Sequence, residues 1–328
     1  MKLAIVGATG LVGRTMLRVL EERDVAIDTL VPLASKRSAG STITFKGQNY
    51  VVEELTHDSF DGLDYALFSA GGSTSRAYAP SAAKAGCVVI DNSSAWRMDP
   101  YVPLVVPEVN ADDVRDHHNI IANPNCSTIQ MVVALKPLHD VFGLQRIVVS
   151  TYQSPSGAGQ KGVDQLMGEL ENRRVDEPIS PHPLAFSTVF HTLDPETGWT
   201  DEEVKMMRET RRIMHLPDLP VTVTCVRVPV LGGHSESVYI ETEREASLSD
   251  VIHIMKEAPG VVYVDPTSAM EYPTPQSVKD TDPVYVGRIR KDPSTPNGLL
   301  LWVVADNLRK GAATNAVQIL ELLMMETA

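Results

Sequence analysis

The stretch LAIVGATGLVGRTMLRVLEER, residues 3–23, decides the fold. Leu3 to Val6 are consecutive apolar residues, as in a buried strand, and Arg14 to Arg23 are amphipathic at helical spacing. Between them lies Gly7-Ala8-Thr9-Gly10-Leu11-Val12-Gly13. Glycines suit this position because the backbone must approach a pyrophosphate closely and aim helix N-terminal amides at it. The spacing alone is moderately specific, but its place at the start of a βαβ pattern indicates a dinucleotide site.

The second predicted strand, Ile27 to Leu33, distinguishes between nicotinamide cofactors. An NAD site usually places an acidic residue at the end of this strand, where it binds the ribose hydroxyls. Here the strand is followed by Ala34-Ser35-Lys36-Arg37-Ser38, which offers two cations and two hydroxyls but no carboxylate. This composition suits a 2′-phosphate, so we predict NADP. A solvated basic turn is the alternative interpretation.

Strands continue to alternate with helices after this point. Tyr65 to Ala70 predicts a buried strand ending in Gly71-Gly72-Ser73-Thr74, and a helix from Ser75 to Ala85 precedes a strand from Val88 to Asp91. This alternation predicts an α/β fold with a parallel, doubly wound (Rossmann-type) sheet. Ligands of such sheets bind beyond the carboxyl ends of the strands. Arg97 follows one of these strands and either clamps an anion there or is a surface arginine.

One cysteine is placed where an apolar run ends and a helical pattern begins. Ile120 to Ala122 predicts the end of a strand, and Asn123-Pro124-Asn125-Cys126-Ser127-Thr128 follows. From Ser127, apolar residues recur at helical spacing as far as the Pro137 region. Free amides and the helix dipole at a helix N-terminus stabilise a thiolate and can hold an oxyanion. We therefore predict that Cys126 is a nucleophile; a buried, inert cysteine is the alternative.

Two later segments offer further polar residues. The predicted strand Arg146 to Gln153 leads into Ser154-Pro155-Ser156-Gly157-Ala158-Gly159, a loop that lets the backbone approach a ligand. A helix is predicted between Thr200 and Met214, starting at a capping box of Thr200 and Glu203. Glu202 and Lys205 then share one helix face, and taken alone this pair is best interpreted as solvated helix charges.

The predicted strand Val221 to Val230 carries an arginine among apolar residues. Its alternation places Arg227 on the same face as Val221, Val223 and Cys225. Such an arginine needs an anion, either a structural carboxylate or a substrate. Beyond the strand, Gly232-Gly233 precede His234, and we expect this turn to expose the ring to a cleft as an acid/base. His117-His118 lacks partners at ligand spacing, so we predict no metal site.

The C-terminal part of the chain changes character. Strands are predicted at Val261 to Val264, Val284 to Arg290 and Leu299 to Ala305, with few helices between them. This pattern predicts a second domain of α+β type with a mixed or largely antiparallel sheet. The length of 328 residues is enough for two domains with separate cores.

The bulk composition excludes several classes of partner. A formal charge of −13 argues against nucleic acid. The three cysteines show neither metal spacing nor an even-numbered disulfide framework, so we expect a reducing cytoplasm. No apolar run approaches the ~20 residues of a membrane span. The start MKLAIVGATG leads straight into a predicted strand and a glycine loop, so we expect no signal peptide.

With these motifs in the order found, the chain resembles bacterial aspartate-β-semialdehyde dehydrogenases from residue 1 to the final helix. The resemblance implies NADP-dependent reductive dephosphorylation of L-aspartyl-4-phosphate to L-aspartate 4-semialdehyde, on the route to diaminopimelate, lysine, threonine and methionine. It also implies that the last helix packs on the cofactor domain and that the second domain forms a homodimer. The expected domains are 1–122 plus 307–328 for NADP, and 123–306 for catalysis and dimerisation.

The resemblance also assigns roles to single residues. Cys126 forms a thioester, His234 is the acid/base, and Gln153 orients the acyl group. Arg227 binds the substrate carboxylate and Glu202 lies near the amino group, while the phosphate and substrate site further includes Arg97, Asn125 and Lys205. The expected cofactor-binding residues are Gly7, Thr9, Gly10, Leu11, Val12, Gly13, Ser35, Arg37, Ser38, Thr74, Ser156, Gly157 and Asn307.

Two other functions compete with this one. N-acetyl-γ-glutamyl-phosphate reductases share the fold and chemistry, but their cysteine turn is of Pro-Gly-Cys-Tyr type rather than Asn-Pro-Asn-Cys-Ser-Thr. A catalytically silent NADP-binding paralogue is the other alternative. The presence of Cys126, Gln153, Arg227 and His234 together argues against it.

Overall fold

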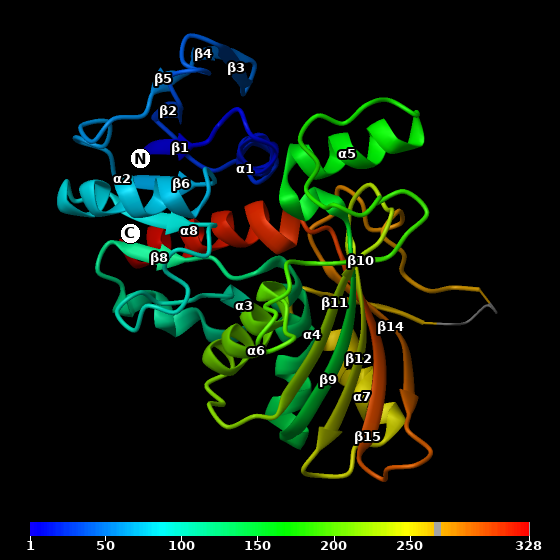
Figure 1. Cartoon of the computed structure of the whole chain (residues 1–328). Coiled ribbons are helices and arrows are strands. Elements are labelled where there is room, and N and C mark those ends of the chain that lie inside the picture. The colour runs from blue at the N-terminus through cyan, green and yellow to red at the C-terminus, as the bar shows by residue number, and fades with distance from the viewer. Residues whose placement is uncertain (266–269, 328) are drawn as a thin grey trace. The chain divides into compact units, whose positions relative to one another are not determined.

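The computed structural model describes residues 1–265 and 270–327, and these fall into two units (Figure 1). The first unit is Met1–Asn125 with Ala312–Ala328, and the second is Cys126–Gly311. The junctions therefore fall at 125/126 and 311/312, against 122/123 and 306/307 in the sequence-based prediction. Residues 266–269 and 328, which the predicted domains include, lie outside the described residues.

The first unit contains a six-stranded sheet in which every neighbouring pair is parallel. The strands in spatial order are β5 (Glu53–Glu54), β2 (Thr29–Ala34), β1 (Lys2–Val6), β6 (Tyr65–Phe68), β7 (Val88–Asp91) and β8 (Ile120–Ala122). The strand order reverses between β1 and β6. In open α/β sheets that reversal marks the crevice where ligands bind. The predicted doubly wound fold is confirmed.

Helices cover this sheet and supply the remainder of its core. They are α1 (Leu11–Glu22), α2 (Gly72–Lys84), α3 (Pro107–Asn110), the 3-10 helix η1 (Ala111–Asp116) and α8 (Thr314–Thr327), and β3 (Thr42–Phe45) and β4 (Gln48–Val51) form a separate hairpin. Val317 and Leu320 of α8 are buried in one cluster with Leu3 and Leu20. Figure 1 shows α8 against the sheet of this unit, as the resemblance implied.

The second unit is built on a seven-stranded mixed sheet. Its strands in order are β10 (Val189–Phe190), β11 (Val221–Arg227), β9 (Leu144–Gln153), β12 (His234–Thr242), β15 (Gly298–Ala305), β14 (Val284–Lys291) and β13 (Val261–Val264). Two pairs, β11 with β9 and β13 with β14, are parallel, and the others are antiparallel. The predicted mixed sheet of an α+β domain is confirmed.

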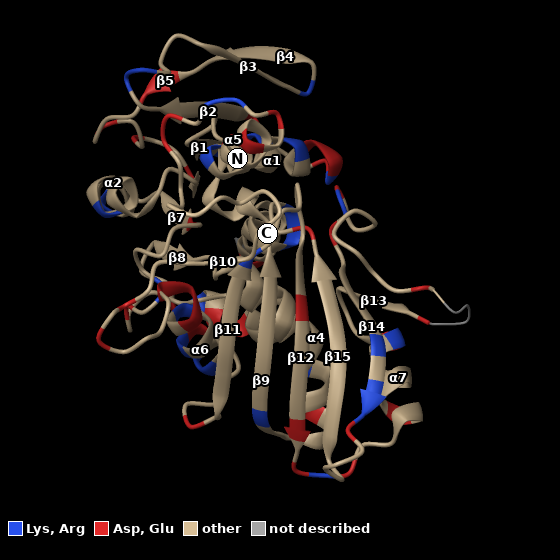
Figure 2. Cartoon of the chain, turned by 45° about the vertical axis from the view of Figure 1, so that its right-hand side comes forward, with Lys and Arg blue, Asp and Glu red and all other residues tan. Residues whose placement is uncertain are grey.

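One face of that sheet is covered by α4 (Cys126–Phe142), which lies behind the strands in Figure 2. The helix is buried nearly all round, as expected of a helix in the core of a domain. The other helices of this unit are η2 (Pro155–Ala158), α5 (Gln160–Leu170), α6 (Asp201–Ile213) and α7 (Leu248–Glu257), and the π-helix η3 (Arg309–Ala313) spans the second junction.

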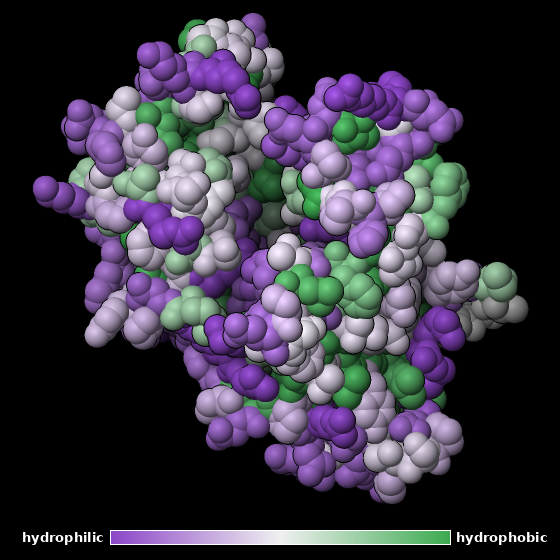
Figure 3. Space-filling model, viewed as in Figure 1, coloured by the Kyte–Doolittle hydropathy of each residue, from purple (hydrophilic) through white to green (hydrophobic). Residues whose placement is uncertain are grey.

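Figure 3 shows hydrophilic residues over most of the visible face, with apolar residues in small groups among them. Within the described residues, we find no helix that combines the length and apolar character needed to cross a membrane.

Candidate functional site

Cys126 is the first residue of α4, as predicted. Strand β8 ends at Ala122, so Asn123-Pro124-Asn125 is the whole connection to the helix. Cys126 is partly exposed, whereas Cys87 and Cys225 are fully buried. Burial raises the pKa of the Cys87 thiol to about 12 and that of Cys225 further still. Cys126 is therefore the cysteine suited to act as a nucleophile.

Gly311 lies directly against this cysteine. A Cβ added to Gly311 would stand 2.8 Å from the Cys126 Cβ, closer than real side chains approach. The position therefore requires glycine, because any side chain there would displace the first residue of α4.

Gln153, the last residue of β9, joins the start of α4 to α6. Its Nε2 donates to Ser127 Oγ at 2.9 Å and lies 3.3 Å from both Thr151 Oγ1 and Glu202 Oε1. The side chain is buried. Hydrogen bonds to several buried partners fix its orientation beside Ser127, the residue after Cys126.

Glu202 is buried in the first turn of α6, so the interpretation of Glu202 and Lys205 as a solvated pair is wrong for the carboxylate. The capping box of Thr200 and Glu203 is confirmed and sets the start of the helix. Lys205 Nζ lies 3.3 Å from Glu202 Oε2 and 2.9 Å from Asp201 Oδ2. Burial works to lower the pKa of Lys205, but these two carboxylates raise it on balance.

Arg227, at the end of β11, has no salt bridge within the described part of the chain, and its Nη1 atom is buried without a hydrogen-bond partner there. Its Nη2 lies 3.3 Å from His191 Nδ1. Burial lowers the pKa of Arg227, while Glu202 and Cys126 oppose that shift electrostatically. The sequence left two possible anionic partners for Arg227, a structural carboxylate and a substrate. The surroundings of Arg227 fit a substrate anion better than a structural carboxylate.

His234 is the first residue of β12 and is fully buried, so the expectation that the glycine turn exposes the ring is wrong. The antiparallel pairing of β12 with β9 and β15 encloses it. Burial lowers the pKa of His234 to about 3, which keeps the ring neutral. Its Nδ1 accepts the Ser154 backbone N–H at 3.0 Å. The proton of the neutral ring is therefore on Nε2.

Strand pairing brings three of these side chains into one row. Gln153 pairs with Arg227 of β11 on one side and with His234 of β12 on the other. A Cβ added to Gly157 would stand 3.4 Å from His234 Nε2 and 3.8 Å from Arg227 Nη1. Both nitrogens therefore converge on the backbone at Gly157, and neither has a described hydrogen-bond partner.

Asn307 fixes the loops beside this row. Its Oδ1 accepts the Gly233 backbone N–H at 2.9 Å, and its side chain lies 3.1 Å from Ser156 Oγ. The three residues predicted to lie near the nicotinamide are thus together in the second unit: Ser156, Gly157 and Asn307.

The first unit holds the other predicted cofactor residues. Gly7 has a positive φ of 86°, and a Cβ at Gly13 would stand 2.2 Å from the Gly7 carbonyl oxygen. The N-cap Gly10 provides no side-chain hydrogen bond, which leaves the first amides of α1 for a ligand. Ser35 and Arg37 are exposed directly after β2. This geometry fits a dinucleotide phosphate.

Arg97 belongs to the first unit and is buried, so it is not a surface arginine. Its Nε donates to the Asn123 carbonyl at 3.0 Å and its Nη2 to the Asn92 carbonyl at 2.8 Å. The side chain of Asn123 accepts from Asn315 Nδ2 at 2.7 Å. These contacts brace the connection before Cys126, in which Asn125 is also buried.

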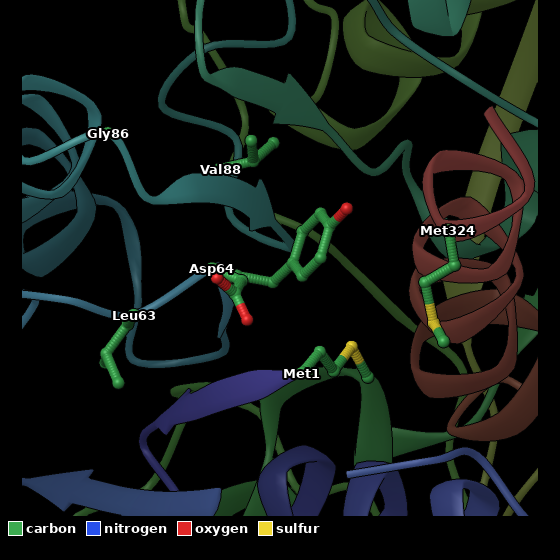
Figure 4. Close-up of a pocket in the computed structure, with 7 residues that line it drawn as sticks. Met1, Leu63, Asp64, Gly86, Val88 and Met324 are labelled. Atoms are coloured by element: carbon green, nitrogen blue, oxygen red, sulfur yellow. The ribbon is translucent and has the colours of Figure 1, made fainter. Parts of the chain in front are cut away.

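A pocket of about 570 Å³ in the first unit is not this site. Figure 4 shows Met1, Leu63, Asp64, Val88 and Met324 around it. These residues lie at or before the amino ends of β1, β6 and β7, or on α8. Cofactors of doubly wound sheets bind at the opposite edge.

Three residues of the second unit were not predicted from the sequence. His191 lies beyond a proline-rich segment and Gly311 within a polar one, so no periodic pattern marked either. Glu236 is fully buried two residues after His234, and burial raises its pKa well above the ordinary value. Glu236 shares a face with the apolar Val238 and Ile240 at strand spacing, and this alternation was a signal that could have identified it.

Comparison with known proteins agrees with this geometry. Residues 2–117 match the family model "Semialdehyde dehydrogenase, NAD binding domain", and residues 135–310 match "Semialdehyde dehydrogenase, dimerisation domain". The aspartate-semialdehyde dehydrogenase of Aquifex aeolicus is 56% identical over 99% of this chain and 98% of that protein. The aspartate-semialdehyde dehydrogenase of Bacillus subtilis is 52% identical over 98% of this chain and 96% of that protein.

A solved structure supports the same relationship. Aspartate semialdehyde dehydrogenase II from Vibrio cholerae, complexed with ASA, superimposes with a TM-score of 0.93 at 46% identity, over 99% of this chain and 98% of that chain. The chain belongs to the aspartate-semialdehyde dehydrogenase family.

Proposed function

We propose that the residues around Cys126 catalyse reductive dephosphorylation of L-aspartyl-4-phosphate to L-aspartate 4-semialdehyde and phosphate. The observation that carries this proposal is the row of Arg227, Gln153 and His234 across three neighbouring strands. Gln153 also reaches Ser127, the residue after Cys126. The proposed nucleophile, acid/base and anion-binding arginine thus belong to one unit, which supports the proposal.

Cys126 is the proposed nucleophile. Its thiolate attacks the acyl carbon of the substrate, and the bond from that carbon to the phosphate oxygen breaks. The phosphate leaves with the electron pair, and the acyl group remains on sulfur as a thioester. The position at the start of α4 supports this role, because helix N-terminal amides favour both the thiolate and a negative acyl oxygen.

His234 is the proposed acid/base. Its Nε2–H can donate a hydrogen bond to the acyl oxygen as negative charge develops there. When the aldehyde forms, the carbon–sulfur bond breaks, its electron pair returns to Cys126 as the thiolate, and the Nε2 proton stays on the ring. The Ser154 amide supports this assignment, because it keeps the proton away from Nδ1. Gln153 orients the acyl group from the adjacent strand.

The charges of the second unit match a small amino-acid substrate. Arg227 is assigned to the α-carboxylate, Glu202 to the amino group and Lys205 to the phosphate. Arg97 and Asn125 of the first unit are assigned to the phosphate and substrate by resemblance alone. The net charge of −13 repels anions at long range, so binding must depend on these local charges.

NADP is the proposed cofactor, and NADPH supplies the hydride when bound. The glycine loop and the first amides of α1 would hold its pyrophosphate, while Ser35, Arg37 and Ser38 would hold the 2′-phosphate. Thr74 and the loop residues Thr9, Leu11 and Val12 complete the proposed contacts in the first unit. Ser156, Gly157 and Asn307 are assigned to the nicotinamide.

A homodimer formed by the second unit is also proposed, in a reducing cytoplasm. The match of residues 135–310 to a dimerisation-domain model supports the dimer. The absence of disulfides among the three cysteines agrees with a reducing compartment.

The test is an assay of the reverse reaction with aspartate 4-semialdehyde, NADP and phosphate. We expect that NADPH formation beyond about one equivalent per active site requires phosphate. N-acetylglutamate semialdehyde should give little product under the same conditions. Preference for the acetylated substrate would identify the competing reductase, and no turnover with either would favour a silent paralogue.

A further inference from the structure

His191 lies beside the arginine that is assigned to the substrate carboxylate. Strand β10 pairs with β11 so that Val189 stands opposite Arg227, and the chain then continues to His191. The ring nitrogen Nδ1 is 3.3 Å from Arg227 Nη2. Nothing in the sequence pattern connected these residues, which are 36 positions apart.

The direction of this hydrogen bond is determined by chemistry. A guanidinium has only donors, so His191 Nδ1 must be the acceptor. The imidazole is therefore neutral, with its proton on Nε2. Burial, followed by the positive charge of Arg227, lowers the pKa of His191 to about 4, which agrees with a neutral ring at physiological pH.

We propose that His191 is a positioning residue that orients the Arg227 guanidinium toward the substrate carboxylate without neutralising its charge. This inference rests on the proposed function of Arg227. With Nη2 occupied by His191, the buried Nη1 faces Gly157 and remains without a described partner. A buried donor of this kind is costly to leave unpaired, so it is well placed to meet a ligand oxygen.

The neutrality of the orienting group is the essential feature. A carboxylate at position 191 would hold Arg227 equally firmly, but it would form an internal ion pair and compete with the substrate for the same cation. A neutral acceptor fixes the geometry and leaves the full positive charge for the ligand. The structure shows no salt bridge to Arg227 among the residues it describes, as this arrangement requires.

Three substitutions test the inference in the assay with aspartate 4-semialdehyde, NADP and phosphate. His191→Leu removes the acceptor and should raise KM for the semialdehyde about tenfold, with a much smaller change in kcat. His191→Gln keeps a neutral acceptor oxygen and should restore most of the affinity. His191→Glu should raise KM more than His191→Leu, because it pairs with Arg227.

Two internal controls separate positioning from general damage. KM for phosphate and for NADP should stay near the parent values in all three variants, because Arg227 is assigned to neither. His182→Leu changes an exposed histidine of the same segment and should leave all three constants unchanged. Thermal unfolding of each variant identifies any that fail to fold, and the comparison of His191→Gln with His191→Glu remains informative.

The outcomes distinguish this inference from the assignment on which it depends. If Arg227→Ala raises KM for the semialdehyde but His191→Leu does not, Arg227 binds the carboxylate and His191 does not position it. Equal effects of His191→Gln and His191→Leu, or a loss confined to kcat, would also overturn the inference. If Arg227→Ala leaves KM unchanged, both assignments fail.

Discussion

The glycine loop of the first unit and the strand row of the second present different kinds of groups to their ligands. The loop offers backbone amides at the start of α1, whose first turn contains no acidic residue. The row offers the side chains of Arg227, Gln153 and His234 from three strands. Backbone donors do not titrate, but they require glycine where the chain folds closely. Buried side chains supply charge and protons, but they depend on strand register and on shifted pKa values.

This difference predicts how each region fails. Steric changes should damage the loop, with an effect on cofactor affinity. Loss of a functional group should damage the row, with an effect on turnover or on substrate affinity. The following substitutions test whether the two regions fail in these different ways.

The largest effect is expected from Cys126→Ala. Without the nucleophile no thioester forms, so kcat should fall by roughly 10⁴-fold or more. NADP affinity, measured by fluorescence or calorimetric titration, should stay within about twofold of the parent. Appreciable residual turnover would contradict covalent catalysis.

Gly311→Ala and Gly13→Ala form a matched pair of steric changes. The first brings a methyl group to 2.8 Å from the Cys126 Cβ, and the second brings one to 2.2 Å from the Gly7 carbonyl oxygen. We expect Gly311→Ala to lower kcat by up to about 10²-fold, because small displacements of a reacting group are costly. Gly13→Ala should instead raise KM for NADP by a similar factor. If both variants change only kcat, or both change only KM for NADP, the two regions do not differ in the way proposed.

Arg37→Ala tests the choice of cofactor in the first unit. A charge-assisted hydrogen bond to the 2′-phosphate would be lost, so NADP should bind about tenfold more weakly. NAD lacks this phosphate and serves as the internal control. A parallel loss of affinity for NAD would reject the assignment of Arg37.

Glu236→Gln should leave turnover nearly unchanged and should instead alter stability. Burial raises the folded-state pKa of Glu236 well above its ordinary value of 4.5. This carboxyl therefore contributes stability at low pH that is lost as the pH rises toward the folded-state pKa. The variant should gain stability over the parent as the pH rises above about 4.5, by at most about 1.4 kcal/mol per pH unit.

Urea unfolding at several pH values measures that gain. The exposed Glu245→Gln provides the control for removing a surface carboxylate, and it should change the free energy of unfolding only slightly. A difference for Glu236→Gln that is independent of pH would mean that the carboxyl does not titrate differently in the folded chain.

Local features, which are formed by residues close together in the sequence, were predicted correctly. The glycine loop, the start of α4 at Cys126 and the capping box of Thr200 and Glu203 each involve residues within a few positions of one another. Local hydrogen-bonding rules are sufficient for such features. The alternation of strands and helices likewise predicted the parallel sheet of the first unit.

Features that depend on contacts between residues far apart in the sequence were not predicted. Ser154 and His234 are 80 residues apart, and only the register of β9 and β12 places the ring in the sheet rather than on an exposed turn. The burial of Glu202 depends on packing against Gln153 in the same way. Helix α4 also continues through Pro137 to Phe142, because burial within the domain outweighs the lost backbone hydrogen bond.

The central claim is that an acyl group is carried on Cys126 beside this row of side chains. It is tested most directly by mixing the enzyme with aspartate 4-semialdehyde and NADP in the absence of phosphate and recording NADPH formation. We predict a rapid burst of about one NADPH per active site, with the aspartyl group found on the Cys126 peptide by mass spectrometry. No burst, or an acyl group on any other residue, would contradict the account.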